Sequence, residues 1–223
     1  MPLIINIETA TKNCSVSLSK KGKTIAYKEI AEQNFSHAEK LHLFIDELLI
    51  ENKLTYKDLN AVAVSQGPGS YTGLRIGVSS AKGFCYALNL PLIAIDTLEL
   101  LARKIAIKQG IIIPMIDARR MEVYSAFFNQ DYSKTRKIKA EIIDSYSYSE
   151  IQQTIHLVGD GILKFKDILT DEKFIFYDTI IYPSAKEMSW LSFEKYKKGD
   201  FVDVAYFEPY YLKDFLITNK TKP

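Results

Sequence analysis

The chain has 223 residues, 47% of them hydrophobic, which is enough to bury one large core or two smaller ones. Its 29 basic and 27 acidic residues give a formal net charge of +2, whereas a dedicated nucleic-acid-binding protein usually carries a larger positive excess. The sequence has no apolar run of about 18 residues and no basic stretch before its apolar start, so it predicts no membrane association, no signal peptide and a cytoplasmic protein.

The N-terminal half predicts a βββαβαβα series. The alternation of apolar and polar residues indicates strands, and longer segments with helical spacing indicate helices. The expected elements are, in chain order, strands at 3–7, 14–18 and 24–30, a helix at 36–52, a strand at 59–65, a helix at 72–88, a strand at 92–95 and a helix at 97–108. Ser36 and Glu39 form a capping-box pattern at the start of the first helix.

The C-terminal half begins with a similar pattern. The segment IIIPMIDARRMEVYSAFF (111–128) predicts two strands around a short polar turn, as LIINIETATKNCSVSL (3–18) does, and Asp117 aligns with Glu8. A third strand is expected at 136–143, with helices and strands alternating to about 197. Internal repetition of this kind predicts two similar α/β domains, 1–108 and 109–223, packed across a cleft.

A glycine-rich turn, SQGPGSYTGLRIGVSSAKGF (65–84), precedes the helix at 72–88 and raises the question of phosphate binding. A Walker loop requires Gly-Lys-Ser/Thr after the fourth spacer residue, but Leu74 follows Gly73. The dinucleotide pattern requires a third glycine where Thr72 stands. The turn therefore does not predict an ATP site on its own.

Two βββαβαβα halves are typical of the actin, sugar-kinase and Hsp70 superfamily, which implies an α/β actin-like (ASKHA) fold. In that superfamily an acidic residue at the end of each first strand serves the metal or the phosphoryl acceptor, and Glu8 and Asp117 occupy those places. Glu8, Thr9 and Asp117 are either remnant nucleotide contacts or ordinary strand-end groups that satisfy turn amides and salt bridges. The sequence Gly159-Asp160-Gly161 departs from the double glycine expected for adenosine binding.

The chain resembles the bacterial TsaB (YeaZ) family over nearly its whole length. The resemblance rests on five segments: GPGSYTGLRIG (67–77), IETATKNCSVSL (7–18), PLIAIDTLELLA (91–102), IDARRMEVY (116–124) and EPYYLK (208–213). Such proteins were once grouped with M22-like peptidases, but that grouping implies no mechanism. The chain offers no ligand set for a metalloprotease, because its two cysteines and three histidines lack zinc-type spacing.

The resemblance implies a non-catalytic structural and activating subunit of the complex that transfers a threonylcarbamoyl group to the adenosine beside the anticodon of tRNAs. The implied partners are a TsaD-like catalytic subunit, docked through helices 36–52 and 72–88, a TsaE-like ATPase, and tRNA reached indirectly through the complex. No cofactor or metal is expected on this chain alone, while the complex uses ATP and Mg²⁺. The alternative is a small-molecule kinase or ATPase of the same superfamily.

The helix at 72–88 carries a face of small residues that offers a docking surface. Its members, with two apolar residues of the helix at 36–52, form the predicted partner interface: Gly73, Ile76, Gly77, Ser80, Gly83, Phe84, Ala87, Leu43 and Ile50. Each helical glycine costs about 1 kcal/mol relative to alanine, which close approach of another helix would offset. That helix belongs either to the partner or to this chain itself, and the same face would support a homodimer.

Two further features have both an ordinary and a functional interpretation. The segment KTRKIK places Lys134, Arg136, Lys137 and Lys139 on a strand edge, where they either contact tRNA phosphates or protect a solvated edge. Cys14 and Cys85 are far apart in apolar segments, and we expect two buried free thiols.

Overall fold

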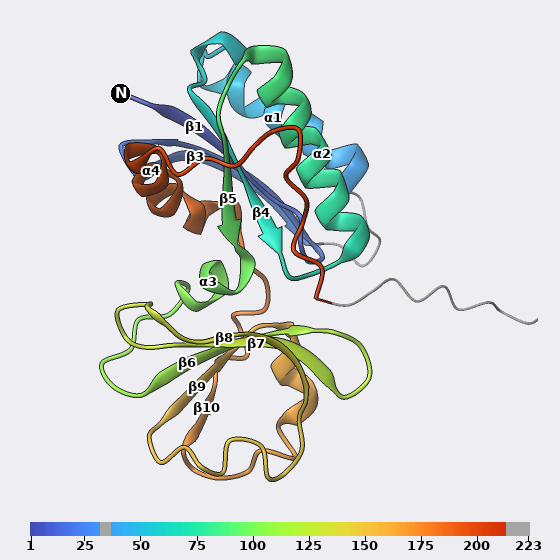
Figure 1. Ribbon diagram of the computed structural model, residues 1–223, viewed down its shortest axis with the longest axis vertical. Coiled ribbons are helices and arrows are strands. Elements are labelled where there is room, and N and C mark those ends of the chain that lie inside the picture. Colours follow the sequence, from blue (N-terminus) through green and yellow to red (C-terminus); the bar gives the residue numbers. More distant parts are fainter. Residues whose placement is uncertain (32–36, 213–223) are drawn as a thin grey trace, which may run out of the picture.

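The computed structural model describes residues 1–31 and 37–212 of the chain. Two five-stranded sheets lie one above the other along the longest axis of the molecule, with the short helix α3 (Thr97–Ala102) between them (Figure 1). This arrangement is the two-domain α/β fold that the internal repetition predicts. Within the described part of the chain, no helix is long and apolar enough to cross a membrane.

The first sheet has the strand order β3-β2-β1-β4-β5. Its strands are β1 (Leu3–Glu8), β2 (Asn13–Lys20), β3 (Lys23–Ala31), β4 (Ala61–Gly67) and β5 (Leu92–Asp96). The central strand β1 pairs antiparallel with β2 and parallel with β4. Two antiparallel hairpin connections are thus followed by two parallel crossovers, which need helices to cover the sheet.

The second sheet repeats this order as β8-β7-β6-β9-β10. Its strands are β6 (Ile111–Asp117), β7 (Glu122–Phe128), β8 (Lys134–Ile142), β9 (Ile155–Val158) and β10 (Phe174–Phe176). As in the first sheet, the central strand pairs antiparallel with the strand that follows it and parallel with the fourth strand. The predicted duplication is therefore present in the topology of the two sheets.

The duplication does not extend to the helices. The crossover from β8 to β9 is built of turns, and the one from β9 to β10 contains only the 3₁₀ helix η2 (Asp160–Phe165). The expected helix at 97–108 ends at Ala102, and Ile105 beyond it is buried against the second sheet. The capping box at Ser36 lies outside the described residues.

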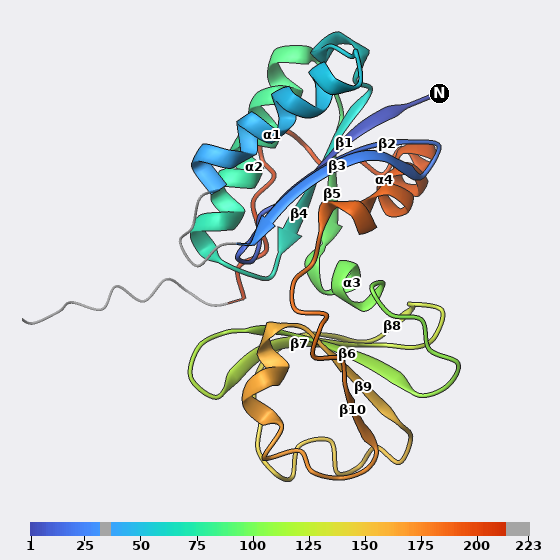
Figure 2. The ribbon, with the colours of Figure 1, turned by 180° about the vertical axis from the view of Figure 1, so that it is seen from behind.

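Helices cover both faces of the first sheet (Figures 1 and 2). The helices α1 (His37–Glu51) and α2 (Tyr71–Leu88) lie on one face, while α4 (Met188–Lys198) and the 3₁₀ helix η3 (Ala185–Glu187) lie on the other. A further 3₁₀ turn, η1 (Tyr56–Asp58), precedes β4. Side chains alternate between the faces of a strand, so Ile5 and Ile7 contact the α1–α2 core and Ile4 contacts the α4 core.

The C-terminal segment does not belong to the second domain. The chain returns from β10 so that Ala185, Met188 and Leu191 pack under the first sheet. It then crosses the edge strand β5, where Val202 pairs with Leu92, and runs along α2 towards the domain junction (Figure 1). The predicted division into 1–108 and 109–223 is wrong in this respect, because residues 183–212 complete the first domain.

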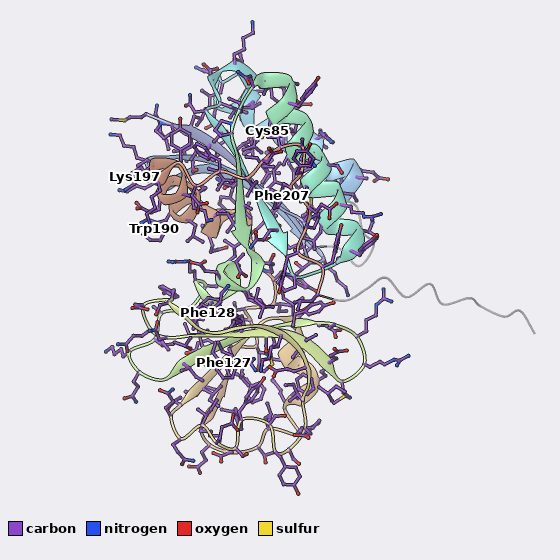
Figure 3. All side chains as sticks on the ribbon, viewed as in Figure 1. Cys85, Phe127, Phe128, Trp190, Lys197 and Phe207 are labelled. Atoms are coloured by element: carbon purple, nitrogen blue, oxygen red, sulfur yellow. The ribbon has the colours of Figure 1, made fainter. Side chains whose placement is uncertain are left out.

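The helix α3 joins the two domains through an apolar core. Leu98 and Leu101 pack against Phe128 and other residues of the second sheet. An ion pair joins Lys134 of β8 to Asp96, the N-cap of α3. Arg103 lies between the rings of Tyr132 and Trp190, so that the hairpin turn after β7 is linked to α4; Figure 3 labels Trp190 and Phe128 on the two sides of this junction.

The placement of α4 predicts that Met188→Ala destabilises the protein by about 2–5 kcal/mol, because the fully buried Met188 fills the second core of the first sheet. Urea denaturation followed by circular dichroism measures this loss. Lys198→Ala, an exposed position on the same helix, serves as the control and should change the free energy of unfolding by less than about 0.5 kcal/mol. Equal small effects of both variants would contradict the assignment of α4 to this core.

Candidate functional site

The helix α2 is fixed at both ends by its own sequence. The Ser70 hydroxyl accepts a hydrogen bond from the amide of Gly73, and Asn89 ends the helix in the left-handed conformation. Leu74, Val78 and Cys85 are buried on the face that covers the first sheet, as their spacing predicts. The C-terminal segment covers part of the remaining surface of α2, where the Lys82 ammonium donates to the carbonyls of Ala205 and Phe207.

A groove of about 480 Å³ lies on the outer surface between α1 and α2. Its lining residues are His42, Ser79, Ser80, Gly83, Phe84 and Ala87. A Cβ atom added at Gly83 would meet no atom within 4 Å, so nothing in the described chain explains a glycine at this helical position. Four of the predicted interface residues, Ser80, Gly83, Phe84 and Ala87, thus share one surface hollow.

Two of the lining residues, His42 and Phe84, belong to an aromatic cluster. The Phe84 ring stacks on Tyr56 at 5.4 Å between centroids and packs at a tilt against His42 at 5.7 Å. The His42 Nε2 atom is 3.2 Å from the Ser80 hydroxyl. Sequence reasoning missed His42, because a histidine at an exposed helical position gives no signal until the neighbouring helix is in place.

The outer surface of α1 adds the two apolar residues that the spacing indicates. Leu43 is 46% exposed and Ile50 is 74% exposed, while Leu41 and Ile45 are fully buried. Exposed apolar side chains lie on α1, and small residues on α2. Together they define what we call the α1–α2 surface: Leu43, Ile50 and the six residues that line the groove.

Three predicted interface residues do not belong to this surface. Gly73 and Gly77 are buried, and a Cβ atom at either would overlap Thr9 in the turn between β1 and β2. Ile76 is only half-exposed and packs onto the core of the first domain. The assignment of Gly73 and Gly77 to the partner interface is therefore wrong, since the close approach that their lack of a side chain permits is made by this chain.

Glu8 lies at the end of β1 and is fully buried. One carboxylate oxygen accepts a hydrogen bond of 2.6 Å from the amide of Ala10, and the other has no partner among the described residues. Burial raises the pKa of Glu8 to about 7, which the Ala10 amide opposes only in part and the nearby Glu187 increases. The side chain satisfies its own turn, as the ordinary interpretation predicts.

Asp117 lies at the end of β6 but is exposed and paired. Its carboxylate accepts a 2.6 Å bond from the Lys164 ammonium and a 2.8 Å bond from the Arg119 amide. The neighbouring Asp160 carboxylate accepts from the Asp117 amide at 2.9 Å. Burial raises the pKa of Asp160 to about 6. An ordinary salt bridge with Lys164 thus accounts for Asp117.

The glycines at 159 and 161 are required for packing. A Cβ atom at Gly159 would overlap the Met115 carbonyl, and one at Gly161 would press on Val123 and Met115. Both glycines therefore let η2 approach the central strands of the second sheet. Glu8 and Asp117 also accept hydrogen bonds within this chain, Glu8 through one carboxylate oxygen and Asp117 from the Lys164 ammonium and the Arg119 amide.

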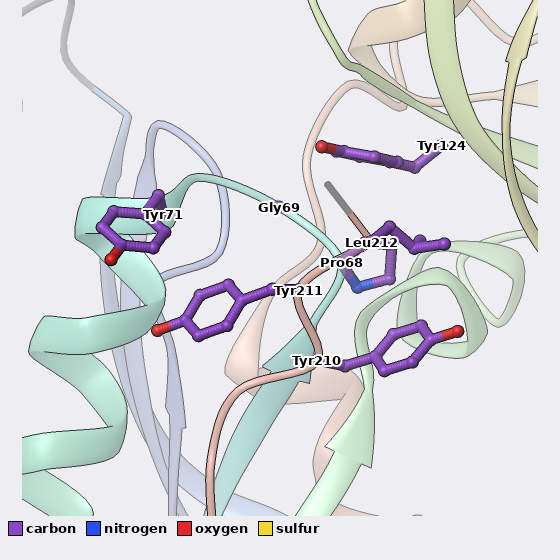
Figure 4. Close-up of a pocket in the computed structure, with 7 residues that line it drawn as sticks. All are labelled: Pro68, Gly69, Tyr71, Tyr124, Tyr210, Tyr211 and Leu212. Atoms are coloured by element: carbon purple, nitrogen blue, oxygen red, sulfur yellow. The ribbon is translucent and has the colours of Figure 1, made fainter. Parts of the chain in front are cut away.

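The mouth between the domains is lined by tyrosines (Figure 4). A hollow of only about 40 Å³ lies between the Pro68–Gly69 turn, Tyr124 of β7 and the C-terminal segment from Tyr210 to Leu212. The Tyr210 amide donates to the Gln66 carbonyl at 2.7 Å, which ties this segment to the end of β4. The hollow is too small for a nucleotide base and its sugar.

The basic cluster on β8 is partly engaged within the chain. Lys134 pairs with Asp96, and Arg136 pairs with Glu141 at 2.6 Å while lying over the Phe127 ring at 3.7 Å. Lys137 and Lys139 are exposed on the edge strand. Two of the four cations are therefore structural, and contact of this edge with tRNA stays a prediction.

The remaining candidates are clusters of metal-ligating side chains and the two cysteines. Over residues 1–31 and 37–212, no three histidine, cysteine or acidic side chains gather as a metal cluster. Cys14 and Cys85 are free and buried, as predicted, and burial raises the pKa of each thiol to about 12. Neither thiol is therefore an activated nucleophile at neutral pH.

The sequence matches one family model and several proteins of known name. Residues 27–205 match the family model of TsaD, tRNA N6-adenosine threonylcarbamoyltransferase. The tRNA threonylcarbamoyladenosine biosynthesis protein TsaB of Escherichia coli is 29% identical over 95% of this chain and 94% of its own length. The protein of the same name from Buchnera aphidicola (subsp. Schizaphis graminum) is 31% identical over 83% of this chain and 90% of its own length.

Solved structures support the fold. YeaZ from Pseudomonas aeruginosa superposes with a TM-score of 0.78 at 23% identity, covering 95% of this chain and 100% of that one. The ethanolamine utilization protein EutJ from Carboxydothermus hydrogenoformans superposes with a TM-score of 0.51 at 12% identity, covering 85% and 90%. At these identities the likeness concerns the fold alone.

The two sheets of common topology define an actin-like (ASKHA) α/β protein. In this chain the strand-end carboxylates make internal contacts, and the α1–α2 surface is exposed. Within that class, the matched family model and the high coverage of the relatives place the chain more narrowly. The chain belongs to the TsaB (YeaZ) family, whose named members take part in the biosynthesis of threonylcarbamoyladenosine in tRNA.

The burial of Glu8 predicts a pH-dependent stability that Glu8→Gln removes. The pKa of Glu8 is about 7 in the folded chain and 4.5 when unfolded, so the native state binds the extra proton between these values. The contribution of Glu8 to the free energy of unfolding is therefore fully present below pH 4.5 and falls by about 3 kcal/mol as the pH rises to 7.

Denaturation at several pH values compares Glu8→Gln with the wild type, so that the contributions of other groups cancel. Glutamine keeps an oxygen for the Ala10 amide but does not ionise, so the stability difference in favour of the variant should grow with pH. A difference that does not vary with pH would contradict a buried, titrating Glu8.

The two kinds of helical glycine predict opposite effects of the same substitution. Gly83→Ala should stabilise the free chain by about 1 kcal/mol, because alanine has the higher helix propensity and its methyl group meets open space. Gly77→Ala should destabilise it by about 1–3 kcal/mol, because the methyl group overlaps the Thr9 hydroxyl. Thermal unfolding of both variants measures the difference, and a common sign would contradict the assignment of Gly77 to an internal contact.

Proposed function

We propose that the chain is the non-catalytic structural and activating subunit of the complex that transfers a threonylcarbamoyl group to tRNA. Its docking partner is a TsaD-like catalytic subunit, and the contact is made through the α1–α2 surface. Family membership supports the pathway, and the observation that carries the docking role is Gly83. This glycine lies inside α2, in its C-terminal half, lines a groove, and has no neighbour in the described chain to require it.

The geometry of the groove supports a helix as the docked element. A glycine, a serine and an alanine on one helical face allow another backbone to approach closely, and contact there offsets the roughly 1 kcal/mol that a helical glycine costs. Leu43 and Ile50 on α1 add apolar area beside this face. Burial of such exposed apolar side chains drives association of surfaces of this kind.

The second part of the proposal is that catalysis and cofactors belong to the partners. Glu8, Asp117 and the Gly159–Gly161 segment are all engaged within this chain, which supports a subunit that binds no nucleotide or metal alone. ATP and Mg²⁺ are then used by the complex with a TsaE-like ATPase in the cytoplasm. The chain meets tRNA indirectly, through the assembly.

The third part of the proposal concerns the free chain. The small and apolar residues of the α1–α2 surface would also accept a second copy of this chain, so two copies pair through it around a two-fold axis when the catalytic subunit is absent. Homodimer and heterodimer then compete for one surface. A substitution that fills the groove removes both assemblies together.

Docking predicts that Gly83→Leu abolishes binding of the TsaD-like subunit from the same cell. A leucine meets no atom of its own chain at the Cβ position, so folding is preserved while the groove is filled. Light scattering on a gel-filtration column measures the assemblies, with the wild type forming a one-to-one complex and the variant eluting uncombined. Ile142→Arg, at a 72% exposed apolar position of the second domain, controls for a general effect of surface change.

Two outcomes would contradict the proposal. A wild-type chain that forms no complex removes the docking role, and Mg²⁺-dependent ATP turnover by the chain alone would instead support a kinase or ATPase. A complex that survives Gly83→Leu but is lost with Ile142→Arg would move the interface to the second domain.

A further inference from the structure

The turn between β1 and β2 holds the starts of both helices of the α1–α2 surface. Three consecutive buried residues, Thr9, Ala10 and Thr11, make these contacts. In each case a backbone or hydroxyl group of the turn meets a helix end directly. The superfamily resemblance associates this turn with phosphates, and here it faces helices of its own chain.

The contacts to α2 come from Thr9 and Ala10. The Thr9 hydroxyl donates a 2.8 Å hydrogen bond to the carbonyl of Gly73, within the first turns of the helix. Gly73 and Gly77 have no side chain at the positions where α2 rests on Thr9. The Ala10 carbonyl accepts a 2.6 Å bond from the amide of Ser70, the N-cap residue.

The contact to α1 comes from the next residue. The Thr11 carbonyl accepts a 2.7 Å bond from Nε2 of His37, the first residue of α1 and a buried one. The turn therefore links the N-terminal ends of the two helices at adjacent positions. Because the apolar faces of α1 and α2 also rest on the sheet, these polar bonds govern how each helix is rotated and shifted along its axis, rather than whether it packs.

We infer that Thr9 is a positioning residue for partner binding, because its hydroxyl holds α2 in the orientation that opens the α1–α2 groove. The inference rests on the proposed docking function. Without the bond to Gly73, the first turns of α2 sample other positions and the binding-competent arrangement becomes a fraction of the population. The apparent Kd is then the intrinsic Kd divided by the fraction of molecules in the binding-competent arrangement.

The experiment compares Thr9→Val with Thr9→Ser and with Ser17→Ala. Valine removes the hydroxyl, while serine keeps it. Ser17 is a matched control: its buried hydroxyl also donates to a backbone carbonyl, Ala185 O at 2.7 Å, but on the face of the sheet opposite to α1 and α2. Two measurements are made: the Kd for the TsaD-like subunit by isothermal titration, and amide hydrogen exchange of residues 71–80.

We expect Thr9→Val to raise Kd about tenfold, the effect of one lost buried hydrogen bond expressed in binding, and to speed exchange in 71–80. Thr9→Ser should restore both to near the wild-type values. Ser17→Ala should leave Kd unchanged even where it lowers thermal stability as much as Thr9→Val does.

Three outcomes overturn the inference. A wild-type Kd for Thr9→Val means that the hydroxyl does not position the surface. An equal rise in Kd for Thr9→Val and Ser17→Ala means that only general stability is involved. Weak binding by Thr9→Ser, which keeps the hydroxyl, would mean that the hydroxyl alone does not position the surface. Failure of the wild type to bind is a separate result, which overturns the proposed function itself.

Discussion

The structure depends on one constraint, which is the complete burial of the central strand β1. All six of its residues are shielded from solvent, so both faces of the first sheet must be covered by other elements. The helices α1 and α2 cover one face, and the other face is covered only when the chain returns from the second domain to add η3 and α4. This return explains why the domains are not consecutive halves of the chain.

The same constraint determines which surfaces remain for other proteins. Each covering helix uses one face for the sheet, and its outer face remains for other contacts. On α1 and α2 those outer faces meet in a groove lined by the rings of His42 and Phe84 and by a glycine that has no internal contact. On α4 the outer face instead carries Trp190, which stacks on Arg103 at the domain junction, so that helix is occupied by an internal role.

The ends of the two first strands differ although the two sheets share one topology. In each sheet an acidic residue ends the first strand, but Glu8 is buried on its own turn and Asp117 is paired with Lys164. Both strand-end carboxylates thus accept hydrogen bonds from groups of this chain. The mouth of the cleft is also narrowed by the C-terminal segment and its tyrosines (Figure 4).

The sequence by itself determined the strands, the two long helices, the duplicated sheet order and the family, because apolar periodicity and turn residues are local signals. It also indicated that the glycines of α2 mark close approaches. It could not say which glycine approaches what, since Gly77 and Gly83 have the same sequence signal but one meets Thr9 and the other meets solvent. Only the tertiary structure decided this, and likewise placed His42 in the groove and residues 183–212 on the first sheet, because each depends on segments far apart in the chain.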